Sequence, residues 1–150
     1  HLHTAYLDET PLDAMAARCR AVTTEFENVP AAAMERLERH CAVAPAGRCV
    51  AIAQDRVLEK RFIAQHGVPV APHAVIEKID DFANASPQLF PAILKTARLG
   101  YDGKGQVTVD NVHDAREAWV RLGRVACVLE KKLPLRQEVS CVVCRAADGS

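Results

Sequence analysis

Three of the seven glycines of the 150-residue chain gather in one octapeptide, LGYDGKGQ, at residues 99–106. Glycine loses more conformational freedom on folding than any other residue, so this clustering requires a cause. One interpretation is a hairpin turn, since Asp-Gly between two strands is a strong turn signal. The other is a loop whose backbone lies against phosphate, where a side chain would be in the way. The octapeptide alone leaves both open.

A lysine ends the apolar run that precedes this loop, Ile93-Leu94-Lys95. Taken alone, Lys95 is either a strand-end charge that reaches water or a cation held beside the loop. The segments 90–96 and 106–109 are typical of strands, so the loop joins two neighbouring strands and Lys95 lies near its edge. A lysine beside a flexible glycine loop favours phosphate binding.

The elements that must position these residues follow from the spacing of apolar side chains. Thr10 is expected to cap a first helix, residues 21–26 to form a strand, and Pro30 to open a second helix with Met34, Leu37 and Cys41 on one face. Alternation of helix, strand and helix predicts an α/β layer with a parallel sheet.

Asp55 is expected to cap a third helix, which buries Leu58 and Phe62 and ends at His66-Gly67. Beyond it, a two-layer α+β unit is predicted. Its strands are 73–76, 90–96, 106–109 and 126–130, its helices are 79–85 and one carrying Val112, Ala115, Trp119 and Leu122, and a further strand follows at 138–145.

The charges balance, with 19 Lys and Arg against 19 Asp and Glu. A neutral chain lacks the basic surface expected for nucleic acid or an acidic membrane, so we expect neither as a partner. No apolar run approaches the roughly 20 residues that span a bilayer. The chain opens on His1 and stops just after a strand-like run, so we expect a piece of a longer protein that is inactive by itself.

Six cysteines raise the question of disulfides or a metal site. Cys141-Val-Val-Cys144 has the spacing of a metal or redox pair, but in a strand, positions three apart point to opposite faces. Thiols in the core of a cytoplasmic protein are the interpretation we favour, with no metal ligand assigned. The cysteines are Cys19, Cys41, Cys49, Cys127, Cys141 and Cys144.

Four stretches, taken in order, resemble the ATP-grasp enzymes. They are Gln54-Asp55-Arg56-x-x-x-Lys60, Lys95 with the loop 100–106, Val128-Leu129-Glu130-Lys131, and Glu138-Val139-Ser140. With VTTEFENVP at residues 22–30, they resemble in particular the 5-(carboxyamino)imidazole ribonucleotide synthases. The resemblance implies part of an ATP-grasp fold, of the α/β and α+β classes: residues 1–71 end an N-terminal doubly wound domain and include a connecting helix, 72–133 form a complete lid, and 134–150 begin the large lobe.

The resemblance also implies a function. It is the ATP-dependent carboxylation of 5-aminoimidazole ribonucleotide with bicarbonate, through carboxyphosphate, in de novo purine synthesis by a ligase that forms a C–N bond. The whole protein would be a homodimer. Two alternatives stay open: another ATP-grasp ligase, of the formate-dependent glycinamide ribonucleotide transformylase or biotin carboxylase type, and a nucleotide-binding module without catalysis.

The site residues are likewise implied by the resemblance. Lys95, Asp102 and Lys104 would act in catalysis, and Arg56 and Lys95 would contact the ATP phosphates. Glu138 would accept a ribose hydroxyl. The loop covering the phosphates would be Gly100, Tyr101, Asp102, Gly103, Lys104, Gly105 and Gln106, and the hinge receiving adenine would be Glu130, Lys131, Lys132 and Leu133.

Mg²⁺ is the second expected cofactor, with ligands outside these 150 residues. Asp80, Asp81 and Asp110 are interpreted as solvated residues at helix starts rather than as its ligands. Glu25 and Glu27 have two interpretations that the sequence does not separate. They either supply negative charge to the start of the helix at Pro30 or belong to a site.

Overall fold

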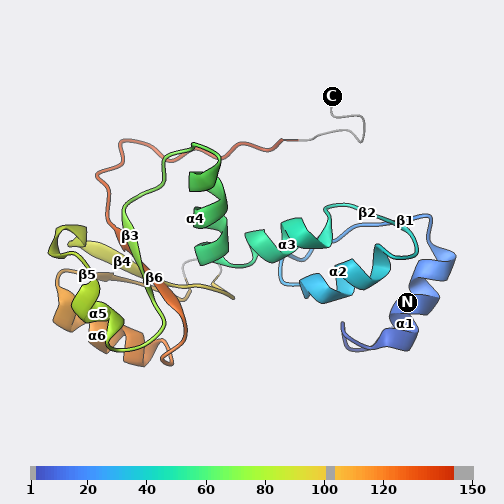
Figure 1. The fold of residues 1–150 in the computed structure, drawn as a ribbon, viewed down its shortest axis with the longest axis horizontal. Helices are drawn as coiled ribbons and strands as arrows, with labels where there is room; N and C mark the ends of the chain where they lie inside the picture. The colour runs from blue at the N-terminus through green and yellow to red at the C-terminus, as the bar shows by residue number, and fades with distance from the viewer. Residues whose placement is uncertain (1–2, 101–103, 144–150) are drawn as a thin grey trace.

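The computed structural model describes residues 3–100 and 104–143, which form two parts joined through helices α3 and α4 (Figure 1). The N-terminal part contains a two-stranded parallel sheet, with Val22 opposite Val43, and this confirms the predicted parallel pairing. Its elements are α1 (Glu9–Arg18), β1 (Ala21–Val22), α2 (Ala31–Leu37), β2 (Ala42–Val43) and α3 (Gly47–Ala53).

Several sequence expectations for this part are wrong in detail. Asp8, rather than Thr10, is the N-cap of α1. The first strand ends at Val22, because residues 23–29 turn away from the sheet. Helix α2 ends at Leu37, so Cys41 lies outside it. Strand β2 and helix α3 were not predicted. Strand β2 has only two residues, which is too short for an alternating pattern to be recognised.

A bidentate ion pair joins α1 to α2. The Arg36 guanidinium donates to both carboxylate oxygens of Asp13 at 2.8 Å and lies 3.1 Å from Glu9. Hydrogen bonding to Arg36 lowers the pKa of Asp13 below its ordinary value, and the partial burial of the pair opposes this shift only in part. The pair fixes how the first helix lies on the second.

The second part is a four-stranded antiparallel sheet of order β3-β6-β4-β5. Helices α5 and α6 cover one face, and α4 lies toward the other (Figure 1). Its elements are α4 (Arg56–Gln65), β3 (His73–Ile76), α5 (Asp81–Asn84), the 3-10 helix η1 (Pro87–Leu89), β4 (Ala92–Thr96), β5 (Gln106–Val109), α6 (Val112–Arg121) and β6 (Cys127–Lys131).

Alternation along β4 decides which side chains reach each face. Ala92 and Leu94 are buried in the core between the sheet and α6, where Phe82 meets Trp119 edge to face at a centroid distance of 6.2 Å. Lys95, between Leu94 and Thr96, points to the opposite face. The strands predicted for this part, and its two-layer form, are therefore confirmed.

Helix α4 begins and ends as the sequence predicts. The Asp55 carboxylate accepts hydrogen bonds from the backbone N–H groups of Val57 and Leu58, and Gly67 follows the helix at φ 79°. Its predicted buried face is wrong, because Leu58 is 39% and Phe62 45% exposed. The sheet face toward α4 carries Lys95 and Glu130, and Lys60 of the helix makes an ionic contact with Glu130 there.

The predicted strand 138–145 is absent from its described part, residues 138–143. A strand needs a neighbour to take its backbone hydrogen bonds, and no described strand lies beside this segment. Val139 and Val142 are accordingly exposed.

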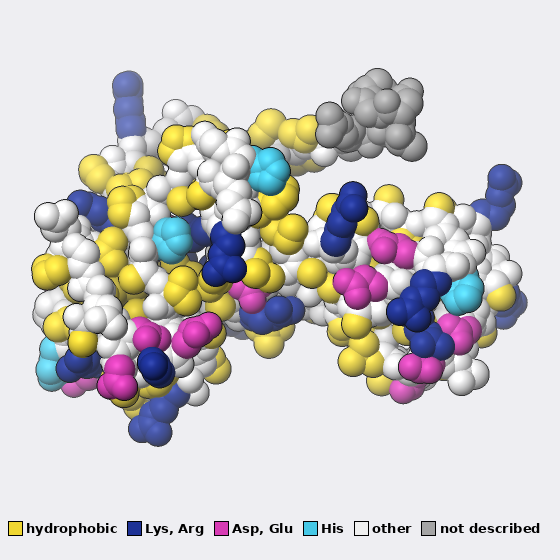
Figure 2. Space-filling model, viewed as in Figure 1, with side chains coloured by type: hydrophobic (Ala, Val, Ile, Leu, Met, Phe, Trp, Pro, Cys, Tyr) yellow, Lys and Arg dark blue, Asp and Glu magenta, His cyan; other side chains and the backbone are white. Residues whose placement is uncertain are grey.

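Within the described residues, no helix has the length and apolar character that crossing a membrane would require. On the face drawn in Figure 2, Lys and Arg side chains are spread over both parts of the molecule, with Asp and Glu among them.

Candidate functional site

Two lysines from different elements hold one carboxylate on the sheet face toward α4. Ile93 lies opposite Glu130 in the β4–β6 register, which places Lys95 diagonally beside Glu130 on the same face. The Lys95 ammonium donates to Glu130 Oε1 at 2.9 Å. Lys60, from α4, binds the other oxygen, Oε2. The three side chains form what we call the lysine–glutamate cluster.

This cluster carries a net positive charge in a place with little water. The exposed fraction is 14% for Glu130, 15% for Lys60 and 22% for Lys95. Burial by itself would raise the pKa of Glu130, but hydrogen bonds and charge from Lys60 and Lys95 hold this pKa below its ordinary value. Two ammonium groups then share one carboxylate. Because an unpaired buried charge is costly, the arrangement favours an additional anion.

The glycine loop joins β4 to β5, so its hairpin interpretation is confirmed. The Thr96 N–H donates to the Gly105 carbonyl at 2.8 Å, and Gly105 has φ 72°. A Cβ at Gly105 would lie 2.6 Å from Thr96 Oγ1. Glycine is needed here for both conformation and space. The hairpin does not exclude phosphate binding, which stays a prediction, and Tyr101, Asp102 and Gly103 lie outside the described residues.

Arg56 lies at the base of this loop. Its Nη1 donates to the Thr96 carbonyl at 2.7 Å and its Nη2 to the Gly100 carbonyl at 3.4 Å, while its backbone N–H donates to the Ala97 carbonyl. A Cβ at Gly100 would lie 2.8 Å from Arg56 Nη1, so the glycine admits the guanidinium. The contact of Arg56 with phosphate stays a prediction, and what the structure adds is its hold on the loop.

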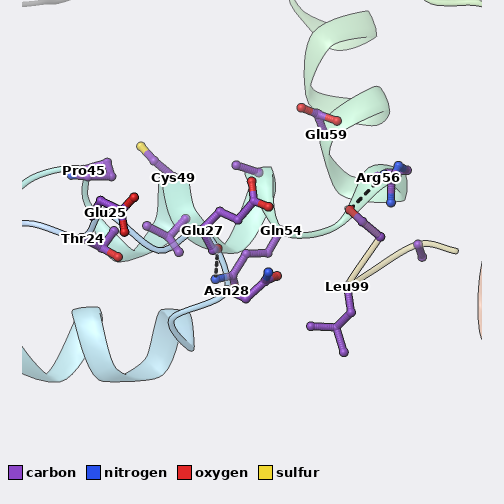
Figure 3. A pocket seen from close by; sticks show the side chains of 14 residues that line it. Thr24, Glu25, Glu27, Asn28, Pro45, Cys49, Gln54, Arg56, Glu59 and Leu99 are labelled. Carbon is purple, nitrogen blue, oxygen red and sulfur yellow. Dashed lines mark hydrogen bonds between the residues drawn. The ribbon is translucent and has the colours of Figure 1, made fainter. Parts of the chain in front are cut away.

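A cavity of about 480 Å³ lies beside the loop, between the two parts of the chain. Glu25, Glu27 and Asn28 line one wall, and Leu99 lies on the opposite wall (Figure 3). Leu99 is 72% exposed and has φ 59°, a left-handed conformation that residues other than glycine adopt rarely. The segment between the walls comes from the end of α3 and the start of α4.

The two interpretations of Glu25 and Glu27 can now be compared. Helix α2 has no acidic residue in its first turn, and both glutamates line the cavity instead. This placement favours membership in a site over a role at the helix start.

The remaining predicted site residues lie around the end of β6 and the start of β5. Gln106 is opposite Lys95. The backbone N–H of Lys131 donates to Pro72 and that of Lys132 to Pro91, so these two donors already have partners within the chain. Glu138 lies in the exposed segment after β6. The assignment of adenine to residues 130–133 and of ribose to Glu138 stays a prediction, as does the catalytic role of Lys104.

Sequence reasoning missed two residues. Lys60 belongs to the motif that begins at Gln54, but it had no assigned role. The available signal was its spacing four residues after Arg56, which puts both on one side of α4. Gln54 was also given no role, although its side chain connects three segments of the chain, as described below.

No group of three or more His, Cys, Asp or Glu side chains in residues 3–100 and 104–143 could hold a metal ion. All five described cysteines are free. Cys127 is buried as predicted, whereas Cys49 and Cys141 are exposed, which corrects the prediction of core thiols for those two. Cys144 lies outside the described residues.

The sequence matches the family models of two known domains. Residues 61–150 match the ATP-grasp domain, and residues 1–54 match the ribonucleotide synthetase preATP-grasp domain. The chain therefore belongs to the ATP-grasp family, and the partial ATP-grasp fold expected from the sequence is confirmed.

Individual proteins similar to this chain indicate which branch of the ATP-grasp family it resembles. The chain is 38% identical to an N5-carboxyaminoimidazole ribonucleotide synthase of Pseudomonas aeruginosa, over 99% of this chain and 42% of that protein. It is 37% identical to the bifunctional purine synthesis protein purC/E of Dictyostelium discoideum, over 97% of this chain and 15% of that protein. A crystal structure of the ADP complex of purK, an N5-carboxyaminoimidazole ribonucleotide synthetase, superposes on this chain with a TM-score of 0.88 at 33% identity. The match covers 98% of this chain and 39% of that one. The chain thus spans about two fifths of the synthases it matches.

Proposed function

We propose that the protein containing this chain uses ATP and bicarbonate to carboxylate 5-aminoimidazole ribonucleotide in de novo purine synthesis. The observation that carries the proposal is the position of the cavity. It lies between the glycine loop and a wall bearing Glu25 and Glu27, and the net positive lysine–glutamate cluster lies on the same sheet as the loop. The names of the relatives, and the ADP in one of them, support the same reaction.

The proposed chemistry has two steps. A bicarbonate oxygen attacks the γ-phosphorus of ATP, giving carboxyphosphate and ADP. The amine nitrogen of the ribonucleotide then attacks the carboxyl carbon, phosphate leaves, and the nitrogen loses a proton. Carboxyphosphate hydrolyses readily, so a loop that excludes water from it is useful to the enzyme.

The chain's own residues would contribute charge and position. Phosphoryl transfer depends mainly on alignment and charge neutralisation, which Lys60 and Lys95 can supply to the phosphates. Carboxylates are hydrogen-bond acceptors, so the wall bearing Glu25 and Glu27 suits a substrate with amine and hydroxyl donors. The homodimer, the cytoplasmic location, Mg²⁺ and the domain boundaries at 71 and 133 belong to the same proposal.

ADP release by the full-length protein tests this function. We expect release to require both bicarbonate and 5-aminoimidazole ribonucleotide. Dependence on formate with glycinamide ribonucleotide, or on biotin, would instead assign another ATP-grasp ligase. ADP binding without turnover on any of these substrates would identify a nucleotide-binding module and overturn the proposed activity.

A further inference from the structure

The side chain of Gln54 connects the acidic wall of the cavity to the rest of the site. Its Nε2 group donates to the carbonyl of Glu27 at 2.8 Å and to that of Val29, so both amide hydrogens point at the segment 27–29. Its Oε1 accepts from Arg98 Nη2 at 3.4 Å. An amide can do both, whereas a carboxylate has no hydrogen to donate to a carbonyl.

The next two residues bind the opposite wall. The Asp55 carboxylate lies 3.5 Å from Arg98 Nη1, in addition to capping α4. Arg56 holds the carbonyls of Thr96, Ala97 and Gly100, as described above. Three successive residues, 54–56, therefore each contact the segment 96–100, which leads into the glycine loop.

One tripeptide thus ties two walls that lie far apart in the sequence. Glu27 is separated from Gly100 by more than seventy residues, yet both line the cavity, and Gln54 lies between Glu27 and Leu99 (Figure 3). These contacts join the side chains of residues 54–56 to backbone carbonyls in both walls and to the side chain of Arg98.

We propose that Gln54, with Asp55 and Arg56, is a positioning element that couples the cavity's acidic wall to the glycine loop, so that the amine substrate and the nucleotide strengthen each other's binding. The substrate assignment within this statement rests on the proposed function. The mechanical part, the coupling of segments 27–29 and 96–100, does not.

The test uses the full-length protein and the substitution Gln54→Glu. The glutamate keeps the length of the side chain and an acceptor for Arg98, but it loses both donors to the segment 27–29. We expect the KM for 5-aminoimidazole ribonucleotide to rise about tenfold, because two hydrogen bonds are lost. We also expect the gain in ADP affinity on adding that ribonucleotide to fall toward onefold, with little change in ADP affinity measured alone.

Two further variants complete the design. Gln88→Glu makes the same chemical change at an exposed position in η1 and should leave every value unchanged. Arg98→Gln leaves the hydrogen bonds from Gln54 to Glu27 and Val29 but removes the contacts of Arg98 with Gln54 and Asp55. The gain in ADP affinity caused by the ribonucleotide should therefore fall by a larger factor than the KM for the ribonucleotide rises.

Hydrogen exchange supplies a readout that does not depend on the substrate. Gln54→Glu should speed amide exchange in peptides covering residues 23–30 and 96–100, and leave α6 unchanged. Unchanged exchange in 96–100 would overturn the coupling even where the synthase activity is confirmed. If ADP release by the wild-type protein does not depend on 5-aminoimidazole ribonucleotide, the proposed function is contradicted, but the exchange experiment still tests the coupling. If amide exchange speeds up equally in residues 23–30, residues 96–100 and α6, Gln54 has only a general structural role and the proposal is refuted.

Discussion

Glu130 is the carboxylate that pairs with both Lys60 of α4 and Lys95 of β4. Its pKa is lowered in the folded chain, so its contribution to stability is present above its ordinary value near 4.5 and is lost as the pH falls through the lower, folded-state value. Glu130→Gln leaves two mostly buried ammonium groups without a carboxylate. We expect it to lower the free energy of unfolding by about 2 kcal/mol at pH 7.

Thermal melts of wild type and Glu130→Gln between pH 3 and 8 check this prediction. The difference in Tm should be largest near neutral pH and shrink as the pH falls below the ordinary carboxyl pKa of 4.5 toward the lowered pKa of Glu130, since the wild-type carboxyl group then becomes protonated. Glu77→Gln, at an exposed position, is the matched control and should shift Tm little. A Tm difference that stays constant with pH would show that the ion pairs do not stabilise the fold.

Lys95 is predicted to contact phosphate as well as Glu130. Charge-assisted hydrogen bonds contribute about 1.5–3 kcal/mol, so Lys95→Ala should lower kcat/KM for ATP in the full-length protein by roughly 10- to 100-fold. Lys78→Ala removes the same charge from an exposed position and should change nothing. Steady-state kinetics check the prediction. If Lys95 serves only Glu130, stability will fall while kcat/KM is retained.

Cys127 and Cys49 should differ in reactivity because the thiolate is the reactive form. Burial raises the pKa of Cys127 to about 11, which leaves about one thiolate per thousand at pH 8. Cys49 is exposed at the cavity. Alkylation with iodoacetamide followed by peptide mass spectrometry should label Cys49 in the native protein and Cys127 only after denaturation. Equal labelling of both would contradict the burial of β6.

At the scale of elements, the β4–β5 hairpin requires glycine at position 105 for two reasons. Gly105→Ala imposes a left-handed conformation on alanine, costing roughly 1 kcal/mol, and brings its Cβ against Thr96 Oγ1. Gly123→Ala is a close control, because Gly123 has φ 86° and no atom within 4 Å of the added Cβ. We expect Gly105→Ala to lower the denaturant midpoint distinctly more than Gly123→Ala.

The companion substitution Thr96→Ala removes the atom that the new Cβ would meet. In the Gly105→Ala background it should recover part of the lost stability, which a double-mutant cycle measures. No recovery would mean that conformation alone requires the glycine. Activity measured on the same variants separates a turn from a phosphate loop, since a loop that only turns the chain should lose activity in proportion to stability.

At the scale of the whole molecule, the chain spans about two fifths of the related synthases. We expect the 150 residues alone to release no ADP from ATP under conditions in which the full-length protein does. Exposed apolar side chains after β6, Val139 and Val142 among them, should also make the isolated chain prone to association. Turnover assays and light scattering on both proteins check these expectations, and full activity of the 150-residue chain would contradict them.

Local features of the second part of the chain were predictable from the sequence. Asp55 caps α4, Gly67 follows its end, and β4 and β5 form the predicted hairpin. Each of these depends on residues close together in the chain, through helix capping, left-handed glycine or the two-residue alternation of a strand. The ordered motifs likewise indicated the ATP-grasp fold, because their residue types and spacing are specific when taken together.

The partners of these residues were decided by tertiary structure alone. Lys60 meets a carboxylate seventy residues further on, and Gln54 spans from Glu27 to Arg98. No local period encodes such pairs, because they form only when α4 packs against the sheet and the end of α3 reaches the cavity. The same packing leaves Leu58 exposed despite its helical spacing, since periodicity marks a face of α4 but not what lies opposite that face.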